Sequence, residues 1–312
     1  MRKYKVKTII ALSRGLEVLR ALQEMRAASL HDLHRATRLS KSTLIRIVFT
    51  LYQQGLIWQR MVDGAYLPSH SLQQRGQLDD ADWLVEIACP ALEQLCQTVP
   101  WPSVLTIPRL DHVEVLETNS PRSYFDVISV APVGFRANLL RSASGRAYLA
   151  FCPEREREAV LRRLRERGEP GNEKARDVKW VRQLVEATRQ RGYSTRDPDF
   201  GGHYFKTRHD YDDQRNSIAI PILVSGQVLG CINLTWKEKL MTLTQAVERH
   251  LNTLRAAVNS VEQRAKTEGV GAVPVKSSNR PAGNDPRDEK VRKKAIPGSR
   301  LAPPARNYPG PR

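Results

Sequence analysis

Cysteines are few in this sequence and long apolar runs are missing, and each shortage excludes a class of protein. The four cysteines, Cys89, Cys96, Cys152 and Cys231, are far apart and form no C-x-x-C pair. Neither a disulfide scaffold nor a zinc motif is therefore indicated. No uncharged stretch approaches the roughly 20 apolar residues of a membrane span, and no apolar segment follows the basic start of the chain. We expect a cytoplasmic protein without membrane contact.

The common catalytic motifs are also missing. The chain contains no G-x-S-x-G elbow and no G-x-x-x-x-G-K-[ST] loop. His31 and His34 are three residues apart but have no third metal ligand nearby in the sequence. His203 and His209 lie near acidic residues in a polar, loop-like region, where a solvated role is favoured over acid/base chemistry. We expect no catalytic site, no bound metal and no cofactor.

Negative charge is scarce at both ends of the chain. The formal net charge is +17, of which residues 1–76 carry +9, residues 77–265 only +1, and residues 266–312 the remaining +7. A merely solvated basic surface would be spread more evenly. The distribution is typical of a head that contacts nucleic acid and a nearly neutral body with another task.

The stretch from Ser29 to Leu67 contains the parts of a winged helix-turn-helix in order. Ser29, followed by Asp32, is a helix-start signature and predicts a short helix over residues 30–37. Ser40 starts a second helix, which Gly55 ends. Along that helix apolar residues recur at spacings of three and four, which predicts one buried face; they are Leu44, Ile47, Val48 and Leu51.

The outer face and first turn of this second helix are suited to DNA. No acidic residue occurs from Ser40 to Gln59. The runs at residues 56–60 and 65–67 predict two strands, joined through the tight-turn dipeptide Asp63-Gly64. Side chains that can reach phosphates or base edges are Lys41, Ser42, Thr43, Ile45, Arg46 and Thr50 on the helix and Arg60 in the wing.

Helices and strands alternate in the body. A helix is expected at residues 13–25 of the head, and a helical stretch that begins at the acidic residues 79–82 contains Pro90, which predicts a kink or two consecutive helices. Mixed antiparallel strands and helices predict an α+β domain. The expected strands are 104–107, 112–116, 124–130, 218–224 and 228–234, and the expected helices are 144–151, 154–167, 178–191 and 244–265.

Two blocks of the chain resemble one known family. Residues 12–19, 41–47 and 64–67 resemble the DNA-binding domain of IclR-type bacterial transcriptional regulators, and residues 142–151 resemble the segment that opens a helix in the effector domain of that family. Residues 191–193 and the strands around residues 225–226 also fit. The chain departs from the family at Arg38, where a turn glycine is usual, and at Ser40, where proline is usual. A left-handed Arg38 would cost on the order of 1 kcal/mol.

The resemblance implies a sensor sheet of the GAF/PAS-like kind, whose effectors are often carboxylates. By family position, the candidate effector-binding residues are Ala143, Ser144, Gly145, Asp197, Asp199, Ile218 and Ile220. A helix N-terminus presents free N–H groups to an anion. An ordinary serine cap without a ligand remains the alternative. Pro221 stands where relatives have a polar or thiol side chain.

We expect four segments: a winged helix-turn-helix domain at 1–78, a linker helix at 79–99, an effector-binding and oligomerisation domain at 100–265, and a disordered basic tail at 266–312. The expected partners are double-stranded DNA with a pseudo-palindromic operator, a small aromatic carboxylic acid and a second copy of the chain in a homodimer or homotetramer. RNA polymerase is a further candidate partner, and the expected location is the nucleoid. The alternatives are an architectural nucleic-acid binder and an enzyme with a DNA-anchoring head.

Overall fold

The computed structural model describes residues 9–69, 80–119 and 131–268. The strand expected at 124–130 and nearly all of the tail expected at 266–312 lie outside these residues. The first described part holds α1 (Ile10–Met25), α2 (Leu30–Thr37), α3 (Lys41–Gln53), β1 (Ile57–Gln59) and β2 (Tyr66–Pro68). The predicted winged helix-turn-helix is therefore confirmed.

One small core holds the three helices of the head together. Val18 and Leu22 of α1 pack with Leu33 of α2 and with the predicted apolar face of α3. The strands β1 and β2 are antiparallel, and Trp58 lies opposite Leu67. Gly64, in the turn between them, has a φ of 68°, the left-handed conformation that the Asp-Gly dipeptide predicts.

A six-stranded antiparallel sheet forms the centre of the body, in the order β5-β4-β3-β8-β7-β6. Its long central strands are β3 (Ser103–Pro108), β4 (His112–Asn119), β7 (Arg215–Val224) and β8 (Gln227–Lys237), and its short outer strands are β5 (Arg136–Asn138) and β6 (Ser194–Thr195). The α+β class is confirmed. The two short strands were not predicted.

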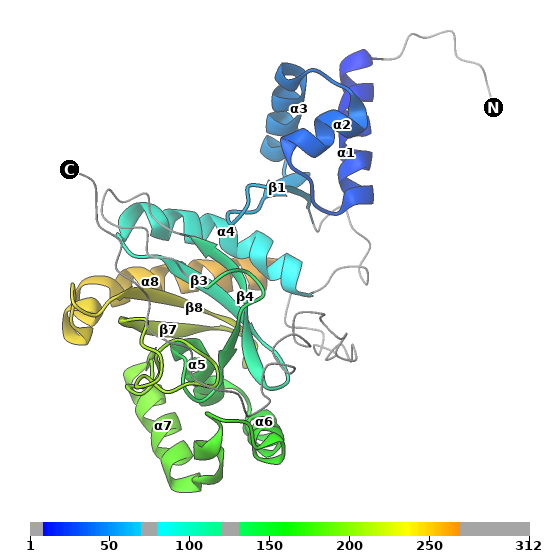
Figure 1. Cartoon of the computed structure of the whole chain (residues 1–312). Coiled ribbons are helices and arrows are strands. Elements are labelled where there is room, and N and C mark those ends of the chain that lie inside the picture. Colours follow the sequence, from blue (N-terminus) through cyan, green and yellow to red (C-terminus); the bar gives the residue numbers. More distant parts are fainter. Residues whose placement is uncertain (1–8, 70–79, 120–130, 269–312) are drawn as a thin grey trace, which may run out of the picture. The chain divides into compact units, whose positions relative to one another are not determined.

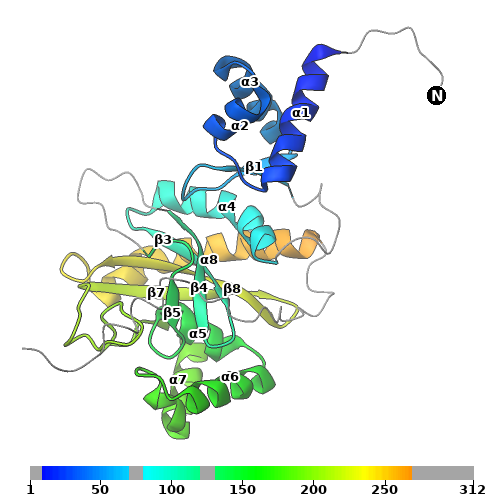
Figure 2. The same cartoon turned by 45° about the vertical axis from the view of Figure 1, so that its right-hand side comes forward.

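Helices cover both faces of the sheet (Figure 1 and Figure 2). One face is covered by α4 (Asp80–Thr98) and α8 (Leu243–Thr267), and the other by α5 (Ala143–Phe151) and α7 (Val178–Arg191). The helix α6 (Glu154–Arg167) and the 3-10 helix η2 (Glu173–Arg176) lie on the α5 side. The helix α4 continues through Pro90, so two consecutive helices, one of the predicted alternatives, are not found.

Candidate DNA-binding surface and effector site

Side-chain caps fix the turn between α2 and α3. Ser29 and Asp32 form the predicted capping box, in which each side chain accepts from the other residue's backbone N–H. Arg38 ends α2 with φ 54° and ψ 14°, so the turn does hold this arginine in the left-handed conformation. Ser40 then caps α3 by accepting a hydrogen bond from the N–H of Thr43 over 3.3 Å. The turn is therefore formed and capped without the usual glycine and proline.

The outer face of α3 carries most of the predicted DNA contacts. Leu44, Val48 and Leu51 are buried, whereas Lys41, Ser42, Ile45, Arg46 and Thr50 are exposed. All three hydroxyls of this set already have a partner nearby, and that of Ser42 lies 3.2 Å from the Oγ of Ser40. The Oγ1 of Thr43 lies 2.8 Å from the Oγ of Ser40, and Thr50 donates to the carbonyl of Arg46 over 2.8 Å.

The wing cation is paired with an acid. Arg60 donates from Nε to Asp63 Oδ1 over 3.0 Å, and this hydrogen bond lowers the pKa of the Asp63 carboxyl below its ordinary value. A DNA phosphate at the wing would have to share Arg60 with Asp63 or displace the Asp63 carboxylate from it. Arg60 is therefore less ready for a DNA contact than the exposed Arg46.

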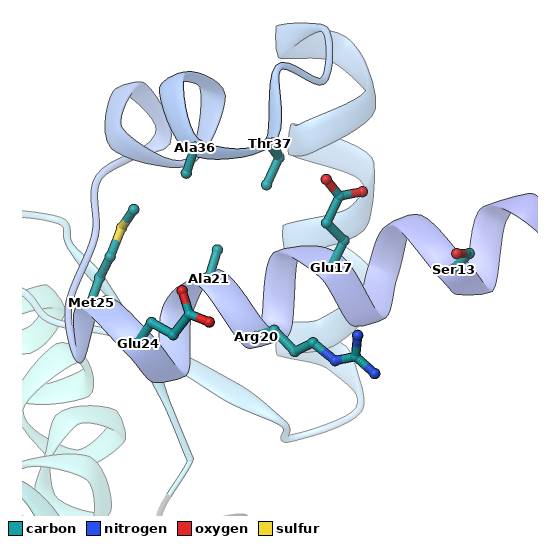
Figure 3. Close-up of a pocket in the computed structure, with 8 residues that line it drawn as sticks. All are labelled: Ser13, Glu17, Arg20, Ala21, Glu24, Met25, Ala36 and Thr37. Carbon is teal, nitrogen blue, oxygen red and sulfur yellow. The ribbon is translucent and has the colours of Figure 1, made fainter.

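A groove of about 420 Å³ lies between α1 and α2 (Figure 3). Glu17, Arg20 and Glu24 of α1 lie along it, and Thr37 of α2 lies across from them. Its two carboxylates would repel DNA phosphates, whereas the α3 face carries no carboxylate. Electrostatics thus favours α3 over this groove as the side of the head that approaches DNA.

The α5 start is buried and its cap is already satisfied within the chain. Ser142 accepts from the N–H of Gly145 over 3.0 Å and donates to the carbonyl of Asn138 over 2.7 Å. Ala143 and Ser144 are each 2% exposed, and Ser144 Oγ accepts from Asn233 Nδ2 over 3.1 Å. The predicted Ala143, Ser144 and Gly145 therefore form one tight corner against the sheet.

The structure does not bring the two predicted isoleucines to this corner. Ile218 and Ile220 pack in the cluster formed with α4 and α8, whereas Ala219, between them on β7, packs in the cluster formed with α5. Successive strand residues point to opposite faces. Ala219 lies opposite Asn233 in the register of β7 and β8. On β7, the residues on the Ser144 side of the sheet are thus the odd-numbered ones.

Of the two predicted aspartates, Asp197 is buried and Asp199 is exposed. Asp197 is 3% exposed and forms ion pairs with Arg146 and with Lys174, the latter over 3.2 Å. Burial alone would raise its pKa, but Arg146, the hydrogen bond from the N–H of Asp199 and Lys174 together outweigh burial and lower it. The Asp199 carboxylate is 60% exposed and lies 3.6 Å from Arg141.

Sequence reasoning missed the cations and amides near the α5 start. Arg141, Arg146 and Arg196 are buried, and burial lowers the pKa of Arg146 and Arg196 although Asp197 and Asp213 oppose this. Arg146 is the basic residue of the family-like segment, which was a usable signal. Asn233 carried no such signal, because its partner Ser144 is far away in the sequence.

The described residues contain no group of three or more His, Cys, Asp or Glu that could hold a metal ion. The side chain of His209 is 97% exposed, in agreement with the solvated role favoured for it. Among the described helices, none is long and apolar enough to cross a bilayer.

A winged helix-turn-helix with an acid-free outer helix, followed by an α+β fold, is typical of a DNA-binding regulator. Comparison with known families agrees: the IclR helix-turn-helix domain matches residues 11–60, and the domain described as "Bacterial transcriptional regulator IclR C-terminal" matches residues 78–263. The chain belongs to the IclR family of transcriptional regulators. This is a family of DNA-binding regulators, not of enzymes.

Several solved structures are similar over most of the chain. An IclR homolog from Microbacterium hydrocarbonoxydans, complexed with 4-hydroxybenzoate, is 25% identical over 82% of this chain and 99% of its own, with a TM-score of 0.46. HmgR of Pseudomonas aeruginosa is 21% identical over 81% and 98%, with a TM-score of 0.44. The Thermotoga maritima IclR is 17% identical over 82% and 99%, with a TM-score of 0.47.

Proposed function

We propose that this regulator binds a small aromatic carboxylic acid and in response activates genes for the catabolism of that acid. The effector would be similar to hydroxyphenylpropionate, because the sequence resembles the activator of hydroxyphenylpropionate catabolism among members of its family. The observation that carries the effector class is the group of buried arginines near the α5 start, Arg141, Arg146 and Arg196, whose positive charge a ligand carboxylate would share with their aspartate partners. A carboxylate needs such compensation when it leaves water.

The ligand's acid group would lie between the first turn of α5 and the nearby cations. Ser144 and Asn233, which are hydrogen-bonded, would form one wall, and Asp197 pairs with Arg146 and holds it in place. The ring would contact Ala219, which shares the α5 face of the sheet. In this arrangement Asp197 orients Arg146 and does not touch the ligand. Asp199, with its exposed carboxylate, would lie at the entrance.

The domain organisation and the oligomer belong to the same proposal. Residues 1–78 would bind DNA, 79–99 link, 100–265 bind the effector, and 266–312 form a tail. Leu12 and Leu16 lie one turn apart on α1 and are 58% and 46% exposed. This apolar surface suits pairing of heads in a homodimer or homotetramer on a pseudo-palindromic operator. Activation would add RNA polymerase as a partner.

Isothermal titration of the full chain with 3-(3-hydroxyphenyl)propionate tests the effector class. We expect binding by the unmodified chain and by Lys179→Trp, an exposed control on α7, and loss of binding in Ser144→Val, which replaces the hydroxyl that Asn233 contacts. Operator affinity, measured by anisotropy, should be equal in all three proteins. Equal titration curves for Ser144→Val and the unmodified chain would show that the ligand does not bind at this corner.

A further inference from the structure

Two large apolar side chains are exposed on the helix that faces DNA. Ile45 is 48% exposed and Phe49, one turn further along α3, is 62% exposed. Phe49 is seven residues after Ser42 and three after Arg46, and these spacings place all three on one face of the helix. The buried face of α3 is formed by Leu44, Val48 and Leu51, so Ile45 and Phe49 are not required for the core of the head.

The surroundings of this pair indicate nucleic acid as its occupant. Lys41 and Arg46 flank the two apolar residues, and no acidic residue occurs from Ser40 to Gln59. The head carries a net charge of +9 over residues 1–76. A purely apolar protein partner would gain nothing from these cations, whereas DNA phosphates complement them.

We infer that Phe49 and Ile45 read the 5-methyl groups of thymines in the major groove. The thymine methyl is the apolar group that a base edge presents there, and phenylalanine is among the side chains that contact it. The two residues are about 6 Å apart along the helix axis, at 1.5 Å per residue, and base pairs are about 3.4 Å apart. The pair therefore selects thymines about two base pairs apart.

This inference rests on the DNA-reading role of α3, and it adds two specificity-determining residues to that role. The inference makes a prediction about one chemical group, the 5-methyl of thymine. Replacement of thymine by deoxyuridine removes the methyl and keeps every hydrogen-bonding atom of the base. Loss of one buried methyl corresponds to about a fourfold loss of affinity.

The test is fluorescence anisotropy with the full chain and its selected operator, in which each thymine in turn is replaced by deoxyuridine. For the unmodified chain we expect about a fourfold loss at one or two positions in each half-site. Phe49→Ala should bind the thymine operator more weakly and lose the discrimination at one position, and Ile45→Ala at the other. Val178→Ala removes an exposed apolar side chain outside the head, at the start of α7 and 64% exposed, and should keep both the affinity and the discrimination.

Two results would overturn the inference. One is an unchanged deoxyuridine penalty in Phe49→Ala and Ile45→Ala. The other is a change in the oligomeric state of Phe49→Ala, measured by sedimentation, without any change in discrimination, since Phe49 would then contact a protein. If the unmodified chain selects no operator, the DNA-reading role of α3 fails instead, so the two failures are distinguishable. Circular dichroism checks that the variants are folded.

Discussion

Asn233 of the central strand β8 donates a hydrogen bond from Nδ2 to Oγ of Ser144, in the first turn of α5, over 3.1 Å. The bond joins the middle of the sheet to the corner at which we place the effector. We predict that Asn233→Ala lowers the free energy of unfolding by about 1 kcal/mol, because a buried hydroxyl loses its donor. Gln227→Ala, at the exposed start of the same strand, should change it by less than about 0.5 kcal/mol. Urea unfolding of both variants measures the difference, and equal midpoints would contradict the assignment.

Gly145 is required by close approach of the α5 start to the chain before it. A Cβ at this position would lie 2.5 Å from Leu139 Cα and 2.6 Å from its carbonyl oxygen. We predict that Gly145→Ala destabilises the protein by about 1–3 kcal/mol, the usual cost of overpacking. Gly15→Ala is the matched control, because nothing lies within 4 Å of its added Cβ in the interior of α1. That control should gain up to about 1 kcal/mol.

Arg38 stores backbone strain in the turn before α3. Its φ of 54° is left-handed, which costs a non-glycine residue roughly 1–2 kcal/mol. Arg38→Gly should therefore slow amide hydrogen exchange in α2 and α3, with a net gain of up to about 1 kcal/mol after the added freedom of the unfolded chain. Arg35→Gly, in the interior of α2, should accelerate the same exchange, because it lowers the free energy of opening of the helix by about 1 kcal/mol. Faster exchange in Arg38→Gly would show that the arginine side chain stabilises the turn.

Asp197 links stability to acid pH. Because Arg146 and Lys174 lower its folded pKa below the ordinary value of 3.8, ionised Asp197 stabilises the fold above about pH 4. This contribution is lost as the pH falls through the folded pKa. Asp197→Asn should lower the free energy of unfolding by about 3 kcal/mol at pH 7, since one partner of a buried ion pair is removed. In strong acid the stability of this variant should approach that of the unmodified chain. Asp199→Asn, which changes an exposed carboxylate, should lower the free energy of unfolding by less than about 1 kcal/mol. Parallel stability curves from pH 7 to pH 2 would contradict this role.

Local signals predicted the helices of this protein well. The bounds of α2, α6 and α7 agree with the predicted ranges. Ser29 and Asp177 cap the starts of α2 and α7, and left-handed glycines end α6 and α7. The place of Arg38 in the turn raised the question of a left-handed conformation, which the structure answers. Such features depend on neighbouring residues, which one sequence contains in full.

Features that depend on distant residues were not predicted. The run from Ile218 to Val224 is buried on both faces of the sheet, so its composition could not say that Ile218 and Ile220 face α4 and α8. The ion pair between Arg146 and Asp197 joins residues 51 positions apart. The short strand β5 contains Arg136 and Asn138 and has no apolar alternation to mark it.

Selection of operators from a randomised double-stranded DNA library by the full chain tests the central claim most directly. We predict enrichment of an inverted repeat with half-sites spaced by whole helical turns, about 10 base pairs each. Arg46→Ala should bind this repeat more weakly and lower the salt dependence of binding by about one phosphate contact. Enrichment of no sequence, or an Arg46→Ala protein with unchanged affinity and salt dependence, would contradict the assignment of α3 as the helix that reads DNA.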